Sequence, residues 1–198
     1  IWYQTRKERL ENKGEWHVVT AGKLAEQYKG DTRRTGAIPK AFKYESDTEY
    51  PLSDTELKIQ VMIAADGSFS KRSTSTRCMV TVRKERKKQR IRYLLNKAGI
   101  TFEEKVGKNR PTEVCFVFYA PERNKDLSKY LSCSRRQLRI IAVESLKWDG
   151  HRGAKGFYFS SNSKSNCDVV QFAFSAIGFS TTLSVNQSAH GNWNATYR

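Results

Sequence analysis

The 198-residue sequence has few cysteines and no long apolar segment, and each shortage excludes a class of protein. Its four cysteines are scattered and form no C-x-x-C pair, so neither a zinc ribbon nor a disulfide framework is predicted. We expect all four to act as small hydrophobic residues in a reducing compartment. No apolar run approaches the roughly 20 residues that span a bilayer, and the first residues lack the apolar core of a signal peptide. The sequence also lacks a Walker-type phosphate loop and a G-x-S-x-G motif.

Acidic residues are in short supply relative to basic ones. The 20 Asp and Glu face 36 Lys and Arg, which gives a formal net charge of +16 and a pI near 9.8. Such an excess predicts attraction to a polyanion. Nucleic acid is the leading candidate and an anionic membrane the second, while a basic chain without a special partner is the third. With 38% hydrophobic and 12% aromatic residues, the chain is expected to fold.

One order of elements occurs twice, and each copy begins with a helix that ends on Asp-Gly. In the first copy, Ser53 and Glu56 fit an S-x-x-E capping box, and the helix runs to Asp66. In the second copy, Ser134 and Gln137 fit a second capping box, and the helix runs to Asp149, 83 residues after the first Asp. Each helix is followed by a predicted strand, helix and strand, at 75–83, 84–100 and 112–120 in the first copy and at 156–162, 163–179 and 181–187 in the second. This repetition predicts an internal duplication.

The duplication predicts that two carboxylates meet. Two copies of one unit tend to pack about a pseudo-twofold axis, and pairing the two Asp-terminated helices would bring Asp66 and Asp149 side by side. Two close carboxylates repel unless a shared proton or a metal neutralises them. Oxygen ligands in a basic protein indicate Mg²⁺, or Mn²⁺ in its place. A divalent metal, a water molecule and a phosphodiester are what metal-assisted hydrolysis requires.

Polar residues on the predicted strands indicate a DNA-binding surface. The segment 75–83 alternates so that Arg77, Thr81 and Arg83 face away from its apolar side. A β-ribbon of this kind fits the DNA major groove. The further candidates for DNA contact are Arg72, Lys84, Lys155, Tyr158, Ser160, Asn162, Lys164, Thr182 and Ser184. We also expect the basic run 83–92 to contact phosphates, with an ordinary solvated helix face as the alternative.

The segments "IQVMIAADG" (59–67) and "IAVESLKWDG" (141–150) resemble the two motifs of a single-chain LAGLIDADG homing endonuclease of the dodecapeptide type, over roughly 53–188. The resemblance implies an α+β fold with two pseudo-symmetric αββαββ-like halves, paired motif helices and β-sheet saddles for DNA. We place an N-terminal basic extension at 1–50, with a short helix at 18–29 and a loop at 30–42, and the two halves at 51–130 and 131–198. The resemblance further implies that Asp66 and Asp149 are catalytic and bind divalent metal, with the backbone carbonyls of Ala65 and Trp148 as auxiliary ligands.

Two features depart from, or remain open within, that family pattern. The third motif position, usually small, is Val61 in one copy and Glu144 in the other, and a buried Glu144 needs a partner. The close helix approach is then expected at other small residues, namely Ala64, Ala142 and Ser145. The family also often places a lysine near the metals, and the sequence does not choose among Lys71, Lys84, Lys147 and Lys155.

The expected function is site-specific hydrolysis of double-stranded DNA with a divalent metal. We expect a monomer with internal pseudo-twofold symmetry, no membrane association, and action in the cytoplasm of a bacterial or phage-infected cell. An RNA maturase and a non-cleaving DNA-binding protein are the alternatives on the same fold. The sequence contains no intein splicing endpoints, so we expect either an endonuclease domain taken from an intein or a free-standing enzyme.

Overall fold

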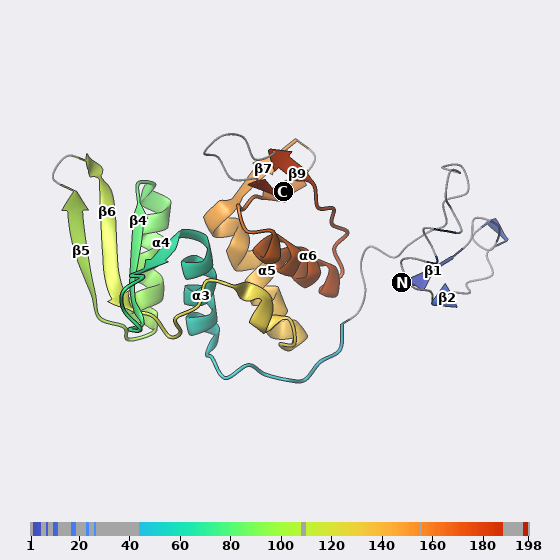
Figure 1. The fold of residues 1–198 in the computed structure, drawn as a ribbon, viewed down its shortest axis with the longest axis horizontal. Helices are drawn as coiled ribbons and strands as arrows, with labels where there is room; N and C mark the ends of the chain where they lie inside the picture. The colour runs from blue at the N-terminus through green and yellow to red at the C-terminus, as the bar shows by residue number, and fades with distance from the viewer. Residues whose placement is uncertain are drawn as a thin grey trace.

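The computed structural model describes residues 2–4, 7, 10–11, 17–18, 23, 26, 44–107, 110–154, 156–187 and 196–197. These residues form a mixed α+β fold in which the sheets are antiparallel, as the sequence predicted (Figure 1). None of the described helices combines the length and the apolar character of a membrane span. The helix and loop expected at 18–42 lie outside the described residues, apart from Val18, Lys23 and Glu26. Strand β1 (Trp2–Tyr3) pairs with β2 (His17–Val18) in this N-terminal region.

The first half begins with α3 (Asp54–Asp66), and the predicted capping box is complete. The Ser53 backbone N–H donates to Glu56 Oε2 at 2.9 Å, while the Glu56 N–H donates to Ser53 Oγ at 3.3 Å. The following residues are apolar nearly all round, and Leu57 and 59–63 are buried. A helix with so little polar surface is stable only inside the protein.

A four-stranded sheet completes the first half, in the order β3-β4-β6-β5. The strands are β3 (Gly67–Phe69), β4 (Arg77–Val82), β5 (Phe102–Gly107) and β6 (Arg110–Tyr119). Helix α4 (Glu85–Lys97) lies between β4 and β5 in the chain. The predicted alternation of β4 is confirmed, because Cys78, Val80 and Val82 are buried and the residues between them are exposed. Strands β3 and β5 were not predicted from the sequence. Strand β3 is short and directly continues a helix, and β5 carries charged, exposed residues where an apolar alternation would mark a strand.

The second half repeats the order of elements with shorter strands. It contains α5 (Arg135–Asp149), β7 (Gly150–Gly153), β8 (Gly156–Phe159), α6 (Lys164–Ala176), β9 (Val185–Gln187) and β10 (Thr196–Tyr197). Among the described residues, its strands form two separate pairs, β7–β8 and β9–β10. The predicted strands at 156–162 and 181–187 were therefore too long. Serines cause the early end of β8, because Ser161 Oγ accepts from the Ser163 N–H and Ser163 in turn caps α6.

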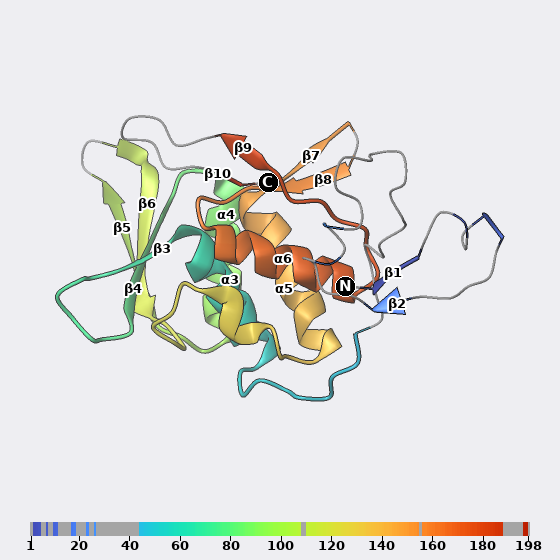
Figure 2. The same cartoon turned by 45° about the vertical axis from the view of Figure 1, so that its right-hand side comes forward.

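The two motif helices pack against each other at the centre of the molecule, with α4 beside α3 and α6 beside α5 (Figures 1 and 2). The predicted pairing of α3 with α5 is thus confirmed. The small residues Ala142 and Ser145 are fully buried, and Ala64 is partly buried against the core. A short 3-10 helix, η2 (Leu127–Tyr130), lies in the connection between the halves and packs on α6.

The segment 44–50 packs on the second half. Its Tyr50 N–H donates to Gln137 Oε1 at 2.8 Å, and Gln137 Nε2 donates back to the Tyr50 carbonyl at 2.9 Å. Ser134 Oγ accepts from the Gln137 N–H, but the Gln137 side chain is occupied with Tyr50, so the second predicted capping box is only half formed. The buried Gln137 amide satisfies its hydrogen bonds with a neighbouring backbone, which the sequence alone did not show.

Candidate functional site

Each motif helix ends on its aspartate and continues without a break into a strand. Gly67 and Gly150, which follow the two aspartates, both adopt extended backbone conformations, with φ of −76° and −89°. A Cβ on Gly67 would lie 2.6 Å from the Ile63 carbonyl oxygen, and one on Gly150 would meet the Leu146 carbonyl even more closely. Glycine is therefore needed here for close approach of the chain to its own helix. This geometry is what turns the Asp-Gly pair from a common turn signal into a fixed position for the carboxylate.

One lysine joins the two aspartates. Lys87 Nζ lies 2.5 Å from Asp66 Oδ2 and 3.4 Å from Asp149 Oδ1. Its side chain is 11% exposed, and the two carboxylate side chains are 23% and 28% exposed. A single ammonium group from α4 of the first half thus contacts the last residue of both motif helices, and the predicted meeting of the two carboxylates is seen in the geometry.

Lys87 is not one of the four lysines that the sequence offered as candidates for this position. Lys147 Nζ instead lies 3.7 Å from Glu144, Lys71 and Lys84 are exposed, and Lys155 is outside the described residues. From the sequence, Lys87 is predicted only to contact phosphate, together with the other basic residues of the run 83–92. A signal was present, because Lys87 stands four positions before the buried Ile91 and so lies on the inner face of α4.

Burial shapes the electrostatics of the pair. Desolvation raises the pKa of Asp149 above its ordinary value, the Lys87 ammonium opposes this rise, and the nearby Asp66 carboxylate adds to it. The carboxylates therefore favour a positive charge between them, and Lys87 supplies it in this structure.

The residues present fit a divalent metal of the Mg²⁺ type. Two carboxylates already share one cationic group, and carbonyls in the last turn of a helix lack partners within the helix, which applies to Ala65 and Trp148. In the described part of the chain, no group of three or more His, Cys, Asp and Glu side chains converges into a closed cage. Mg²⁺ characteristically binds through one or two carboxylates, with water and phosphate oxygens completing its shell. These donors match that pattern.

Beside the aspartates, the buried Glu144 has the partner that its position requires. Its carboxylate accepts from Arg90 Nε at 2.9 Å and Nη2 at 2.5 Å, and from Trp148 Nε1 at 3.1 Å. Glu144 is 2% exposed and Trp148 is 1% exposed. The charge that departs from the family pattern is therefore fully paired.

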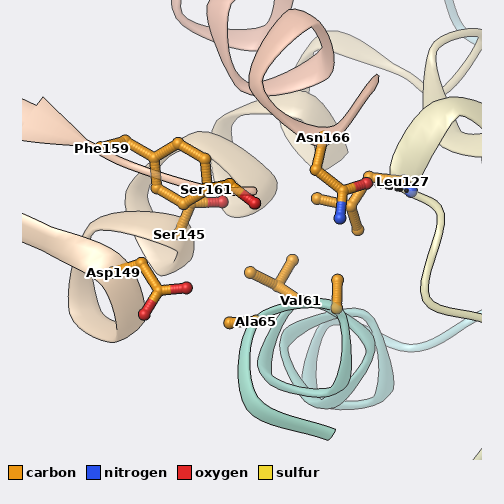
Figure 3. Close-up of a pocket in the computed structure, with 9 residues that line it drawn as sticks. Val61, Ala65, Leu127, Ser145, Asp149, Phe159, Ser161 and Asn166 are labelled. Atoms are coloured by element: carbon orange, nitrogen blue, oxygen red, sulfur yellow. Dashed lines mark hydrogen bonds between the residues drawn. The ribbon is translucent and has the colours of Figure 1, made fainter. Parts of the chain in front are cut away.

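On the other side of the α3–α5 pair there is a small recess of about 10 Å³ that opens to solvent. Figure 3 shows Asp149 at its edge, with Val61 and Ala65 of α3 facing Ser145 of α5 and Asn166 of α6. The recess thus reaches the carboxylate of Asp149 from the side that faces away from Arg90 and Glu144.

The residues expected to contact DNA are spread over both halves. Arg77 and Thr81 are exposed on the outer face of β4, together with Met79, which is 40% exposed. Arg83 donates from Nε to Glu113 at 2.6 Å, and this contact lowers the pKa of Glu113. Phosphate binding by Arg83 would require it to leave this pair.

The other expected DNA contacts lie outside a regular strand face or are partly covered. Tyr158 is half-buried and stacks on His151 at 5.1 Å between ring centres, and Lys164 bonds to Asp168 at 2.7 Å. Ser160 is half-buried just beyond β8. Those that are exposed and outside helices and strands are Arg72, Lys84, Asn162, Thr182 and Ser184, while Lys155 lies outside the described residues.

Comparison with known proteins identifies the fold. No protein-family model matches the chain, and no curated protein matches it either. Mesophilic variants of the homing endonuclease I-DmoI superpose with a TM-score of 0.54 at 12% identity, covering 73% of this chain and 86% of that one. I-DmoI in complex with DNA and Mn gives a TM-score of 0.53 at 13% identity, over 73% and 86% of the two chains.

A second kind of protein shares the fold. The N-terminal LAGLIDADG domain of DUF199/WhiA superposes with a TM-score of 0.50 at 10% identity, over 74% of this chain and 76% of that chain. At such identities the likeness concerns the arrangement of the backbone. The arrangement of α3, α5 and their sheets is therefore the LAGLIDADG homing endonuclease fold, as the two sequence motifs predicted.

Proposed function

We propose that the protein is a site-specific, divalent-metal-dependent endonuclease for double-stranded DNA. The observation that carries this proposal is the contact of one ammonium group, Lys87, with both Asp66 and Asp149. It shows that the last residues of two separate motif helices converge on a single cationic position. The net charge of +16 and the fold shared with I-DmoI, which is known in complex with DNA and Mn, support a polyanionic substrate.

In this proposal, the residues of the site have separate roles. Asp66, Asp149 and the carbonyls of Ala65 and Trp148 would hold the metal, which, when bound, activates water and stabilises charge on the scissile phosphate. Lys87 would neutralise the two carboxylates before substrate arrives and then donate a hydrogen bond to the phosphate oxygens. The exposed Arg77 and Thr81 on β4 would position the duplex. We propose that the protein acts as a monomer, because both carboxylates come from one chain.

A selection for cleaved sequences from a randomised DNA library, with Mg²⁺ or Mn²⁺, tests the activity directly. On the selected target, Asp66→Asn or Asp149→Asn should lower cleavage by orders of magnitude, because water activation and charge stabilisation both depend on the metal. DNA binding should survive, since arginine and lysine contacts to phosphate supply most of the affinity. Because the halves are quasi-equivalent, one of the two single variants is expected to nick the target instead of cutting both strands.

Variants of the two aspartates and binding measurements separate this function from the two alternatives. A double Asn variant that still linearises a plasmid with the target would reject the assignment of the aspartates. A non-cleaving DNA-binding protein would retain specific sequences in a binding selection and cut none of them, with Asp66→Asn leaving every activity unchanged. An RNA maturase would bind structured RNA more tightly than duplex DNA at the same salt concentration.

A further inference from the structure

The buried carboxylate of Glu144 is tied to both sides of the candidate site. On one side it accepts two hydrogen bonds from Arg90 of α4, and on the other it accepts one from the Trp148 indole of its own helix. Lys147 Nζ lies 3.7 Å away at the protein surface. With an exposure of 2%, this carboxylate is paired at close range and shielded from water.

These contacts close a ring with the site itself. Arg90 follows Lys87 by three positions on α4, so both side chains project from the same face. Trp148 directly precedes Asp149, and Lys87 Nζ lies 5.8 Å from the centre of the Trp148 ring. Arg86 adds a hydrogen bond to the Lys147 carbonyl near the end of α5. The Arg90–Glu144 pair therefore fixes α4 against the end of α5 at the point where Lys87 meets the aspartates.

Stability does not explain the pair. A buried ion pair is a weak source of stability, because the desolvation of two charges offsets much of their attraction. In the other half, apolar residues occupy the equivalent positions. The motif helices are related by an offset of 83 residues, which makes Val61 the equivalent of Glu144. The helices that follow are related by an offset of 79 residues, which makes Val169 the equivalent of Arg90. Both valines are buried, at 2% and 1% exposure.

The asymmetry extends to Lys87. Its equivalent in α6 is Asn166, whose amide bonds to the Leu127 N–H and the Lys125 carbonyl and contacts neither aspartate. Ala65 takes the place of Trp148, and the recess of Figure 3, with Asp149 at its edge, lies on this side. In the part of the chain that the structure describes, the charged ring thus occurs on the one side that presents a lysine to the carboxylates.

We propose that Arg90 and Glu144 are positioning residues that hold Lys87 between Asp66 and Asp149. They act through α4, which carries both Arg90 and Lys87, and through the Trp148 ring, which is hydrogen-bonded to Glu144 and lies 5.8 Å from Lys87 Nζ. The consequence for DNA cleavage rests on the proposed function, whereas the placement of Lys87 does not.

The test variant is Arg90→Val/Glu144→Val, which removes both charges together and installs the residue type that the other half uses. The matched control is Arg136→Gln/Glu49→Gln, which removes another arginine–glutamate pair of α5 at the opposite end of the helix, where Arg136 Nη2 lies 2.6 Å from Glu49 Oε2. If the valine pair prevents folding, Glu144→Gln replaces it, because it keeps the shape and one acceptor oxygen for Trp148 and removes the charge and one of the two acceptors for Arg90.

The first readout is the lysine ammonium signal in ¹⁵N–¹H NMR spectra of the metal-free protein. The Lys87 signal is identified by its absence in Lys87→Met. We expect it to be visible in the wild type, because its protons are held by two carboxylates, and to shift or broaden beyond detection in Arg90→Val/Glu144→Val. It should be unchanged in the control. A folded test variant with an unchanged Lys87 signal would overturn the proposal, whether or not the protein cleaves DNA.

The second readout is a double-mutant cycle on single-turnover cleavage of the selected target. We expect Arg90→Val/Glu144→Val to lower the rate constant by about 10-fold to 100-fold, the usual range for residues that orient a ligand shell, with the Kd for DNA unchanged. In a Lys87→Met background the same change should have no further effect, because positioning acts through Lys87. Additive losses would reject a positioning role. If the wild type cleaves nothing, the proposed function fails, and the NMR result alone decides the positioning.

Discussion

Replacing Lys87 with methionine tests whether its ammonium group holds the two carboxylates together. Methionine keeps most of the length and the apolar stem of the side chain and removes the charge. The protein would then hold Asp66 and Asp149 at one place with no cation between them. Because both side chains are largely shielded from water, their repulsion would appear as a loss of stability in the metal-free protein.

The structure sets the scale of this loss. Two unit charges 4 Å apart interact by about 4 kcal/mol at an effective dielectric constant of 20. The aspartates are 23% and 28% exposed, so solvent screens part of this energy, and Asp149 is able to take up a proton because burial raises its pKa. We expect the free energy of unfolding to fall by about 1–2 kcal/mol at pH 7. For a chain of this size, that lowers Tm by about 2–8 °C.

The assay is thermal unfolding in EDTA and again with Mn²⁺. In EDTA, Lys87→Met should unfold below the wild type, and Lys87→Met/Asp149→Asn should recover because the repulsion is gone. Mn²⁺ should raise the Tm of Lys87→Met more than that of the wild type, since the ammonium no longer competes for the carboxylates. The matched control is Lys88→Met, whose lysine is similarly covered, at 13% exposure, and pairs with Glu85. Equal behaviour of the two lysine variants would refute the reasoning.

Three further predictions concern Asp149, Gly67 and two of the cysteines. Burial raises the pKa of Asp149, so the free energy of unfolding falls as the pH rises from about 3.9 toward that raised pKa. In EDTA, Asp149→Asn should therefore have a higher Tm than the wild type only above this pH range. A difference in Tm that does not depend on pH would contradict this prediction. Gly67→Ala should lower the free energy of unfolding by about 1–3 kcal/mol in urea, because its Cβ would lie 2.6 Å from the Ile63 carbonyl oxygen; an unchanged midpoint would show that the turn relaxes freely. In thiol titration at pH 8, the partly exposed Cys115 should react before Cys78, whose pKa burial raises to about 11, and the reverse order would be inconsistent with the core.

Local sequence determined the elements that carry the site. Ser53 and Glu56 set the start of α3 through their reciprocal hydrogen bonds, and the alternation around Cys78 and Val80 set β4. The two Asp-Gly pairs, repeated at a fixed distance, predicted the duplication, the pairing of α3 with α5 and the meeting of their final carboxylates. These predictions succeeded because capping boxes, residue periodicity and internal repeats can be recognised from short segments of the sequence.

Features that depend on contacts with other segments were harder to predict from the sequence, because the local residue pattern is weak and the neighbouring segment decides the structure. The charged strand β5 exists because it pairs with β6, and its own residues show no apolar alternation. The Gln137 side chain left its expected cap because the backbone of Tyr50, 87 positions earlier in the chain, offered it both a donor and an acceptor. Each of these outcomes depends on a partner outside the segment whose structure it decides.

The identity of the lysine at the carboxylates was decided by the tertiary structure. Lys87 is one of seven basic residues in the run 83–92, and composition gives no reason to prefer one of them. The packing of α4 against α3, together with the Arg90–Glu144 pair that holds it to the end of α5, directs this one side chain of the run to the two carboxylates. Sequence determined that two aspartates would meet, because a repeat carries its own symmetry. Only the fold decided which cation would lie between them, because that depends on the direction of a side chain across an interface between the two halves.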